Sequence, residues 1–124
     1  MNKHIVIIED DPELLEVLVM ALKDGGYRVT PFRQLNSMEE LISLQADAFV
    51  LDEKLPGTSG HIICIMLKSK PQTKHLPVLL ISADHSLEHL ASLCEADGYL
   101  LKPFADHQDL QRLLDKTLAA KLPI

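Results

Sequence analysis

Four short apolar runs in this chain each end at polar residues that are suited to binding a metal ion or a phosphoryl group. In chain order, residues 5–8 precede Glu9 and Asp10, residues 49–51 precede Asp52, residues 78–81 precede Ser82, and residues 99–101 precede Lys102. If these runs are parallel strands of one sheet, their carboxyl ends lie together at one edge. The sequence therefore predicts a single site assembled from four distant segments.

Longer stretches with helical periodicity separate the apolar runs. Asp11 and Pro12 mark the start of a first helix, because aspartate is a good N-cap and proline is favoured at the first helical position. Ser37 and Glu40 have the spacing of a capping box for a second helix. Further strands are expected at residues 27–30, 48–51, 77–81 and 98–101, and further helices at residues 61–70, after residue 86 and from about residue 106 through Leu122. This alternation is typical of strand-helix units that build an α/β fold, with a parallel sheet covered on both faces.

The composition limits what kind of protein this is. A chain of 124 residues is expected to fold as one domain over residues 1–124, and its formal net charge of -6 disfavours binding to a nucleic acid backbone. The longest apolar run, residues 62–67, is too short for a membrane helix, and the first residues lack a signal peptide pattern. We expect a cytoplasmic protein that contacts neither nucleic acid nor membrane, with Cys64 and Cys94 as buried free thiols.

The acidic residues of the predicted site need a positive partner. Like charges about 4 Å apart repel by roughly 4 kcal/mol at an effective dielectric of about 20, so Glu9, Asp10 and Asp52 would destabilise one another without a cation. Mg²⁺ prefers one or two carboxylates together with water and phosphate oxygens. We therefore expect these three residues to bind Mg²⁺, whereas Asp11 serves as the helix cap.

Asp52 is the predicted nucleophile of the site. It follows a fully apolar strand, where a carboxylate can accept a phosphoryl group as an acyl phosphate. The ammonium group of Lys102 would neutralise the oxygens of the transferring group, and Pro103 would fix a turn directly after it. The hydroxyl of Ser82 can donate a hydrogen bond to a phosphoryl oxygen. Together these residues indicate phosphoryl transfer to Asp52.

Over essentially its full length, the chain resembles the receiver domain of bacterial two-component response regulators. The resemblance lies in four segments: IVIIEDDPELL from Ile5, VLDEKLPGTSG from Val50, PVLLISA from Pro77 and ADGYLLKPF from Ala96. Any one of them would be weak evidence, but together they are highly specific. The fold that this resemblance implies is a flavodoxin-like three-layer sandwich, in which a doubly wound, five-stranded parallel sheet has the strand order 2-1-3-4-5.

The resemblance implies a phosphorylatable signalling switch. A sensor histidine kinase would pass the phosphoryl group of its phosphohistidine to Asp52. Mg²⁺ would be held by Glu9, Asp10, Asp52 and the backbone carbonyl of Lys54. The peptide bond before Pro103 would be cis, which bonds to proline allow at modest cost. The protein would catalyse only its own phosphorylation and dephosphorylation, so it is not an enzyme in the usual sense.

The resemblance also implies a conformational response through Ser82 and Tyr99. The hydroxyl of Ser82 would move toward the phosphoryl group and the ring of Tyr99 would turn inward. The face made by the fourth helix, fifth strand and fifth helix would then change shape, as a population shift between two packed states. Because no output domain is expected after Ile124, we expect this face to regulate a downstream protein partner.

Two other functions stay open at this point. In the first, the chain is a phosphorelay intermediate that passes the phosphoryl group to a histidine phosphotransfer protein; in the second, it is a docking module that functions without phosphorylation. A haloacid dehalogenase-type enzyme is disfavoured, because its second aspartate, two residues after the nucleophile, is here Lys54. A nucleotide-binding module is disfavoured because acids, not glycines, follow the first strand.

Three further residues, Lys54, Asp84 and Glu95, lead to predictions about the lifetime of the phosphoryl group and the end of the fourth helix. Lys54 and Asp84, two residues after Asp52 and Ser82, occupy positions that tune dephosphorylation in the family. We hypothesise that they pair across the mouth of the site and shield the acyl phosphate from water. Glu95 stands where the family usually has glycine, so the fourth helix is expected to end without that easy left-handed residue.

Replacement of Lys54 by alanine is expected to shorten the half-life of the phosphorylated domain, because the shielding side chain is lost. The decay of a radiolabelled phosphoryl group on the purified domain measures this half-life. An unchanged half-life would contradict the shielding hypothesis.

Overall fold

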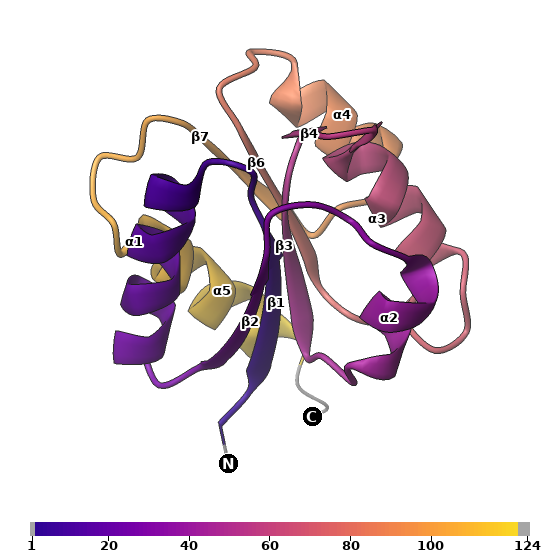
Figure 1. Ribbon diagram of the computed structural model, residues 1–124, viewed down its shortest axis with the longest axis horizontal. Helices are drawn as coiled ribbons and strands as arrows, with labels where there is room; N and C mark the ends of the chain where they lie inside the picture. Colours follow the sequence, from indigo (N-terminus) through magenta and orange to yellow (C-terminus); the bar gives the residue numbers. More distant parts are fainter. Residues whose placement is uncertain (1, 122–124) are drawn as a thin grey trace.

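The computed structural model describes residues 2–121, with a five-stranded parallel sheet at its centre (Figure 1). Its strands are β1 (His4–Ile8), β2 (Arg28–Phe32), β3 (Ala48–Asp52), β6 (Val78–Ser82) and β7 (Gly98–Leu101). They are arranged in the order β2-β1-β3-β6-β7, which confirms the expected order 2-1-3-4-5 when the strands of this sheet alone are counted. Two further short strands, β4 (Lys54–Leu55) and β5 (Thr58–Ser59), form a separate antiparallel pair.

Five helices of the described chain cover the two faces of the sheet. They are α1 (Pro12–Asp24), α2 (Met38–Ser43), α3 (Gly60–Lys68), α4 (Leu87–Leu93) and α5 (Asp109–Ala120). In Figure 1, α1 and α5 lie on the left of the sheet, whereas α2, α3 and α4 lie on its right. None of the described helices is both long enough and apolar enough to cross a membrane. The three-layer α/β architecture expected from the sequence is therefore confirmed.

The central strands are buried because helices cover both sides of them. Every residue of β1, β3 and β6 is buried, and successive side chains of a strand point to opposite faces. Ala48 and Val50 of β3 pack in the cluster below α1 and α5, whereas Phe49 and Leu51 pack in the cluster below α2, α3 and α4. By this alternation the side chain of Asp52 belongs to the α1 and α5 side of the sheet.

The N-terminal signals predicted for the first two helices are formed. The Asp11 carboxylate accepts hydrogen bonds from the backbone N–H groups of Glu13 and Leu14, and Pro12 follows as the first helical residue. At α2, the Ser37 hydroxyl accepts the N–H of Glu40 at 3.1 Å. Local capping chemistry is therefore enough to position both helix starts.

Three element boundaries differ from the sequence-based expectations by more than one residue. The second strand runs to Phe32 instead of residue 30, because it lies at the edge of the sheet, where Pro31 is tolerated. The third helix ends at Lys68, since the Ser69 hydroxyl bonds to the carbonyl of Met66 at 2.7 Å and competes with helix continuation.

The last helix begins at Asp109, three residues later than expected. The carboxylate of Asp106 accepts the N–H of Gln108 at 2.9 Å, which forms a local turn before the helix. The remainder of this helix carries the expected apolar stripe, except that Leu122 lies outside the described residues. Cys64 and Cys94 are free and buried in the cluster below α2, α3 and α4, as expected.

The C-terminal end of α4 has a left-handed residue that is not glycine. The backbone φ angle of Glu95 is 60°. The N–H of Ala96 donates to the carbonyl of Ala91 at 2.9 Å, and the N–H of Glu95 donates to that of Ser92 at 3.3 Å. These two bonds define a Schellman motif, whose left-handed position glycine fills without steric cost. Glu95 adopts this conformation at the cost of a close approach between its Cβ and the backbone.

Replacement of Glu95 by glycine is expected to stabilise the protein by about 1 kcal/mol, because glycine removes this steric cost. The free energy of unfolding in urea measures the effect. Ser92, an exposed residue of α4, provides the control, since Ser92→Gly should destabilise the helix. A less stable Glu95→Gly variant would contradict the assignment.

Candidate functional site

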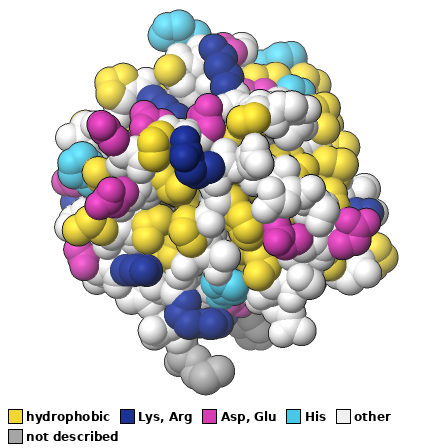
Figure 2. Space-filling model, in the orientation of Figure 1, with side chains coloured by type: hydrophobic (Ala, Val, Ile, Leu, Met, Phe, Trp, Pro, Cys, Tyr) yellow, Lys and Arg dark blue, Asp and Glu magenta, His cyan; other side chains and the backbone are white. Residues whose placement is uncertain are grey.

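The carboxyl ends of four strands bring the sequence-predicted residues together. Glu9 directly follows β1, Asp52 ends β3, Ser82 ends β6 and Lys102 directly follows β7. The side chains of the first three are buried, with Glu9 fully inaccessible to solvent. Figure 2 shows acidic side chains interspersed with lysine and arginine over the upper half of the molecule, where these strands end in Figure 1.

The ammonium group of Lys102 lies between two carboxylates. Its Nζ atom is 2.5 Å from Oε1 of Glu9 and 3.3 Å from Oδ1 of Asp52. Burial disfavours a charge on this amine, but the hydrogen bond to Glu9 and the negative charge of Asp52 outweigh burial and raise the pKa of Lys102. Lys102 is therefore positively charged and links the ends of β1, β3 and β7.

The pKa of the Asp52 carboxyl group is higher than that of an ordinary aspartate. Burial and the neighbouring Glu9 carboxylate raise the pKa of Asp52 to about 7, although Lys102 acts in the opposite direction. An ionised Asp52, which a nucleophile requires, is thus favoured by any further positive charge in the site.

Asp10 adds a third carboxylate to this arrangement. One oxygen atom from each of Glu9, Asp10 and Asp52 lies within 4.8 Å of the others, and Asp10 is exposed to solvent. A set of carboxylate oxygens suits a hard cation better than nitrogen or sulfur ligands would. One Glu9 oxygen is bonded to Lys102, and the other accepts the N–H of Asp11 at 3.2 Å.

Ser82 and Tyr99 lie on the neighbouring strands β6 and β7. The hydroxyl oxygen of Ser82 accepts the N–H of Asp84 at 3.1 Å, and its backbone carbonyl accepts the N–H of Lys102 at 2.8 Å. Tyr99 of β7 pairs in register with Leu80, and about a third of its surface is exposed. The peptide bond before Pro103 is cis, in agreement with the expectation.

The predicted direct pair between Lys54 and Asp84 is not among the ion pairs that the described residues form. The Asp84 carboxylate instead accepts bonds from the N–H and hydroxyl groups of Ser86, at 2.9 and 2.8 Å. These bonds lower the pKa of Asp84, and Lys54 contributes only as a more distant positive charge. A sequence-adjacent serine thus satisfies Asp84 locally. The effect of both residues on phosphoryl lifetime stays a prediction.

Glu53 and His61 form a hydrogen-bonded pair that the sequence analysis did not single out. Oε2 of Glu53 is 2.6 Å from Nδ1 of His61, and Glu53 is almost fully buried. One signal in the sequence pointed to Glu53. An acid directly after Asp52 must point to the opposite side of the strand, under α3, where it needs a buried partner.

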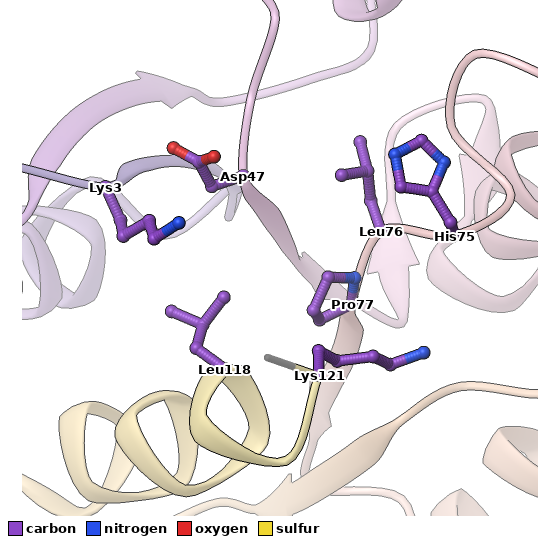
Figure 3. A pocket seen from close by; sticks show the side chains of 7 residues that line it. All are labelled: Lys3, Asp47, His75, Leu76, Pro77, Leu118 and Lys121. Atoms are coloured by element: carbon purple, nitrogen blue, oxygen red, sulfur yellow. The ribbon is translucent and has the colours of Figure 1, made fainter. Parts of the chain in front are cut away.

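A cavity of about 510 Å³ lies at the opposite edge of the sheet (Figure 3). Its lining comes from the residues just before β1, β3 and β6 and from the end of α5: Lys3, Asp47, His75, Leu76, Pro77, Leu118 and Lys121. Lys121 is paired with Asp97 at 3.0 Å, and Asp47 accepts the N–H of His4 at 2.7 Å. None of the residues predicted for the site contributes to this cavity.

Comparison with known proteins identifies the class to which this fold and site belong. A family model of the response regulator receiver domain matches residues 5–115. The chain therefore belongs to the response regulator receiver domain family. The resemblance described from the sequence is thereby confirmed.

Two curated relatives and one solved structure illustrate the relationship. The chain is 32% identical over 118 residues to the phosphate regulon transcriptional regulatory protein PhoB of Rhizobium meliloti, covering 91% of this chain and 51% of PhoB. It is 34% identical over 116 residues to the response regulator MprA of Mycobacterium ulcerans, covering 91% and 49%. The chain thus spans about half the length of these two relatives.

The solved structure is the signal receiver domain of a signal transduction histidine kinase from Syntrophus aciditrophicus. It superposes with a TM-score of 0.84 at 26% identity, over 95% of this chain and 91% of that chain. The receiver fold is therefore shared with a protein of a different overall role from the two regulators.

Replacement of Asp10 by asparagine is expected to raise the melting temperature of the metal-free protein, because one of three crowded negative charges is removed. Mg²⁺ should stabilise the wild type but no longer this variant. Thermal unfolding in EDTA and in Mg²⁺ measures both effects, with the exposed Glu16→Gln as the control. A lower melting temperature in EDTA would count against a clustered site.

Proposed function

We propose that this chain is a phosphorylatable signalling switch that accepts a phosphoryl group on Asp52 from a sensor histidine kinase. One observation carries the proposal. In a member of the receiver domain family, the ammonium group of Lys102 lies 3.3 Å from a buried Asp52 carboxylate, and Glu9 and Asp10 complete an acidic cluster around it. This arrangement supports phosphoryl transfer better than it supports a purely structural role, because it concentrates charges that need a further cation.

The proposed reaction joins an Asp52 oxygen to phosphorus. The carboxylate attacks the phosphorus atom of a phosphohistidine, the phosphorus–nitrogen bond breaks, and the imidazole leaves with the bonding electron pair and takes up a proton. Lys102 neutralises negative charge on the phosphoryl oxygens, since its ammonium group is already beside the attacking carboxylate. Ser82 can donate its hydroxyl hydrogen to one of these oxygens.

The donor atoms of the site fit Mg²⁺. Glu9, Asp10 and Asp52 would hold the ion with their carboxylates, and Lys54 with its backbone carbonyl. Bound Mg²⁺ would supply positive charge that neutralises the phosphoryl oxygens. Because the pKa of Asp52 is about 7 in the metal-free protein, ionisation of Asp52 and cation binding favour one another.

Phosphorylation is proposed to alter the face made by α4, β7 and α5. A phosphoryl group on Asp52 would give the Ser82 hydroxyl a new acceptor, and the partly exposed ring of Tyr99 would turn inward as Ser82 moves. The altered face would then bind a downstream protein partner. The net charge of -6 supports a protein partner over a nucleic acid.

The test uses acetyl phosphate as the phosphoryl donor and intact mass spectrometry as the readout. In the presence of Mg²⁺, the mass should rise by one phosphoryl group, and borohydride reduction should trap the modification at Asp52. EDTA, Asp52→Asn and Lys102→Met should each abolish labelling. Wild-type protein that stays unlabelled would overturn the proposal and favour a docking module that functions without phosphorylation.

A second candidate function is a phosphorelay intermediate. It is favoured by the similarity to a receiver domain that belongs to a histidine kinase. The phosphorylated chain mixed with a histidine phosphotransfer protein distinguishes the two functions. Transfer to histidine that is faster than hydrolysis would favour the relay, whereas hydrolysis alone would favour the switch.

A further inference from the structure

The first turn of α3 is capped by a residue from the end of β3. Ser59 occupies the N-cap position, but its side chain makes no capping hydrogen bond. Instead, the backbone carbonyl of Glu53 accepts the N–H of Gly60 at 3.0 Å, and Oε1 of Glu53 accepts the N–H of His61 at 2.9 Å. The residue that directly follows Asp52 therefore satisfies two N–H groups that a helix start leaves free.

The side chain of His61 makes a second bond to the same carboxylate. Its Nδ1 atom is 2.6 Å from Oε2 of Glu53 and 3.2 Å from the hydroxyl oxygen of Ser59. Glu53 is only 6% exposed, so its carboxylate has little access to water and depends on His61 for both of its oxygens. Removing such a partner leaves a buried charge uncompensated. The Glu53–His61 pair therefore fixes the end of β3 to the start of α3.

The start of α3 packs directly against the backbone of Asp52. A Cβ atom at Gly60 would lie 2.5 Å from the carbonyl oxygen of Asp52 and 3.0 Å from its carbonyl carbon. Contacts this short do not occur between real side chains and backbone, so only glycine fits there. The antiparallel pairing of Lys54 with Ser59 closes the loop between the two elements. A shift of the first helical turn must therefore move Asp52 and Lys54 as well.

We infer that Glu53 and His61 are positioning residues that hold the segment from Asp52 to Lys54 in the geometry required for Mg²⁺ binding. The inference rests on the proposed function, because Asp52 and the backbone carbonyl of Lys54 are the proposed ligands from this segment. The Glu53 side chain lies on the α3 side of the strand, opposite to Asp52. The pair thus acts through the backbone, as outer-shell partners of metal sites do through their ligands.

Isothermal titration calorimetry with Mg²⁺ tests the pair. Glu53→Leu and His61→Leu should each weaken Mg²⁺ binding about tenfold, and the double variant should bind no more weakly than either single variant, because the two residues act as one unit. His61→Ala keeps the backbone N–H bond to Glu53, as His61→Leu does, but places no bulky side chain at the helix start, and it should also weaken binding. Glu53→Gln should retain near wild-type affinity, because its amide oxygen can accept the backbone N–H of His61 and its NH₂ group can donate to Nδ1 of His61.

Lys68→Met is the matched control for a general loss of stability. Lys68 is paired with Asp97 at 2.8 Å, both side chains are largely buried, and the pair lies at the opposite end of α3. This variant should lower the melting temperature but leave the Mg²⁺ affinity unchanged. Equal weakening by Lys68→Met, or unchanged affinity in the Glu53 and His61 variants, would overturn the inference.

Labelling by acetyl phosphate separates this inference from the proposed function. The inference would be overturned, and the proposed function kept, by the following pair of results. The wild-type protein binds Mg²⁺ and becomes labelled, and the Glu53 and His61 variants bind Mg²⁺ with unchanged affinity. Wild-type protein that is never labelled overturns the proposed function instead.

Discussion

One ammonium group placed between two buried carboxylates is the interaction on which the site depends. Lys102 directly follows β7 and contacts both Glu9, which directly follows β1, and Asp52, which ends β3. Glu9 is inaccessible to solvent, so without this partner it would carry an uncompensated buried charge. The parallel topology makes the contact possible, because the carboxyl ends of β1, β3 and β7 all lie at one edge.

A charge imbalance follows from this arrangement. Three carboxylates gather around a single ammonium group, and the pKa of Asp52 is raised to about 7 as a result of burial and its acidic neighbour. A divalent cation would offset this excess of negative charge, and the oxygen ligands of the cluster suit a hard cation such as Mg²⁺. The backbone on the α3 side, held by Glu53 and Gly60, keeps Asp52 where these charges meet.

Much of this could be predicted from the sequence, because the relevant signals are local. Apolar runs mark the buried strands, and the polar residue at the end of each run must lie at the shared edge, which places Glu9, Asp52, Ser82 and Lys102 near one another. The start of α1 could be predicted for the same reason, since Asp11 bonds to its own helix.

The features that the sequence did not reveal depend on competing hydrogen bonds or on partners that are distant in the sequence. Glu53 finds His61 only once β3 and α3 have packed together, and Asp84 bonds to Ser86 instead of pairing with Lys54. Glu95 takes a left-handed conformation because the end of α4 requires it, although its side chain does not favour it. Tertiary packing, not local preference, decides such positions.

The charge balance around Asp52 is measured directly by the pKa of its carboxyl group, determined by carbon NMR in the metal-free protein and again in Mg²⁺. We expect a pKa near 7 without metal, because burial and Glu9 disfavour the charged form, and a clear decrease when Mg²⁺ is added. A pKa in the ordinary range of aspartate that does not respond to Mg²⁺ would contradict this expectation.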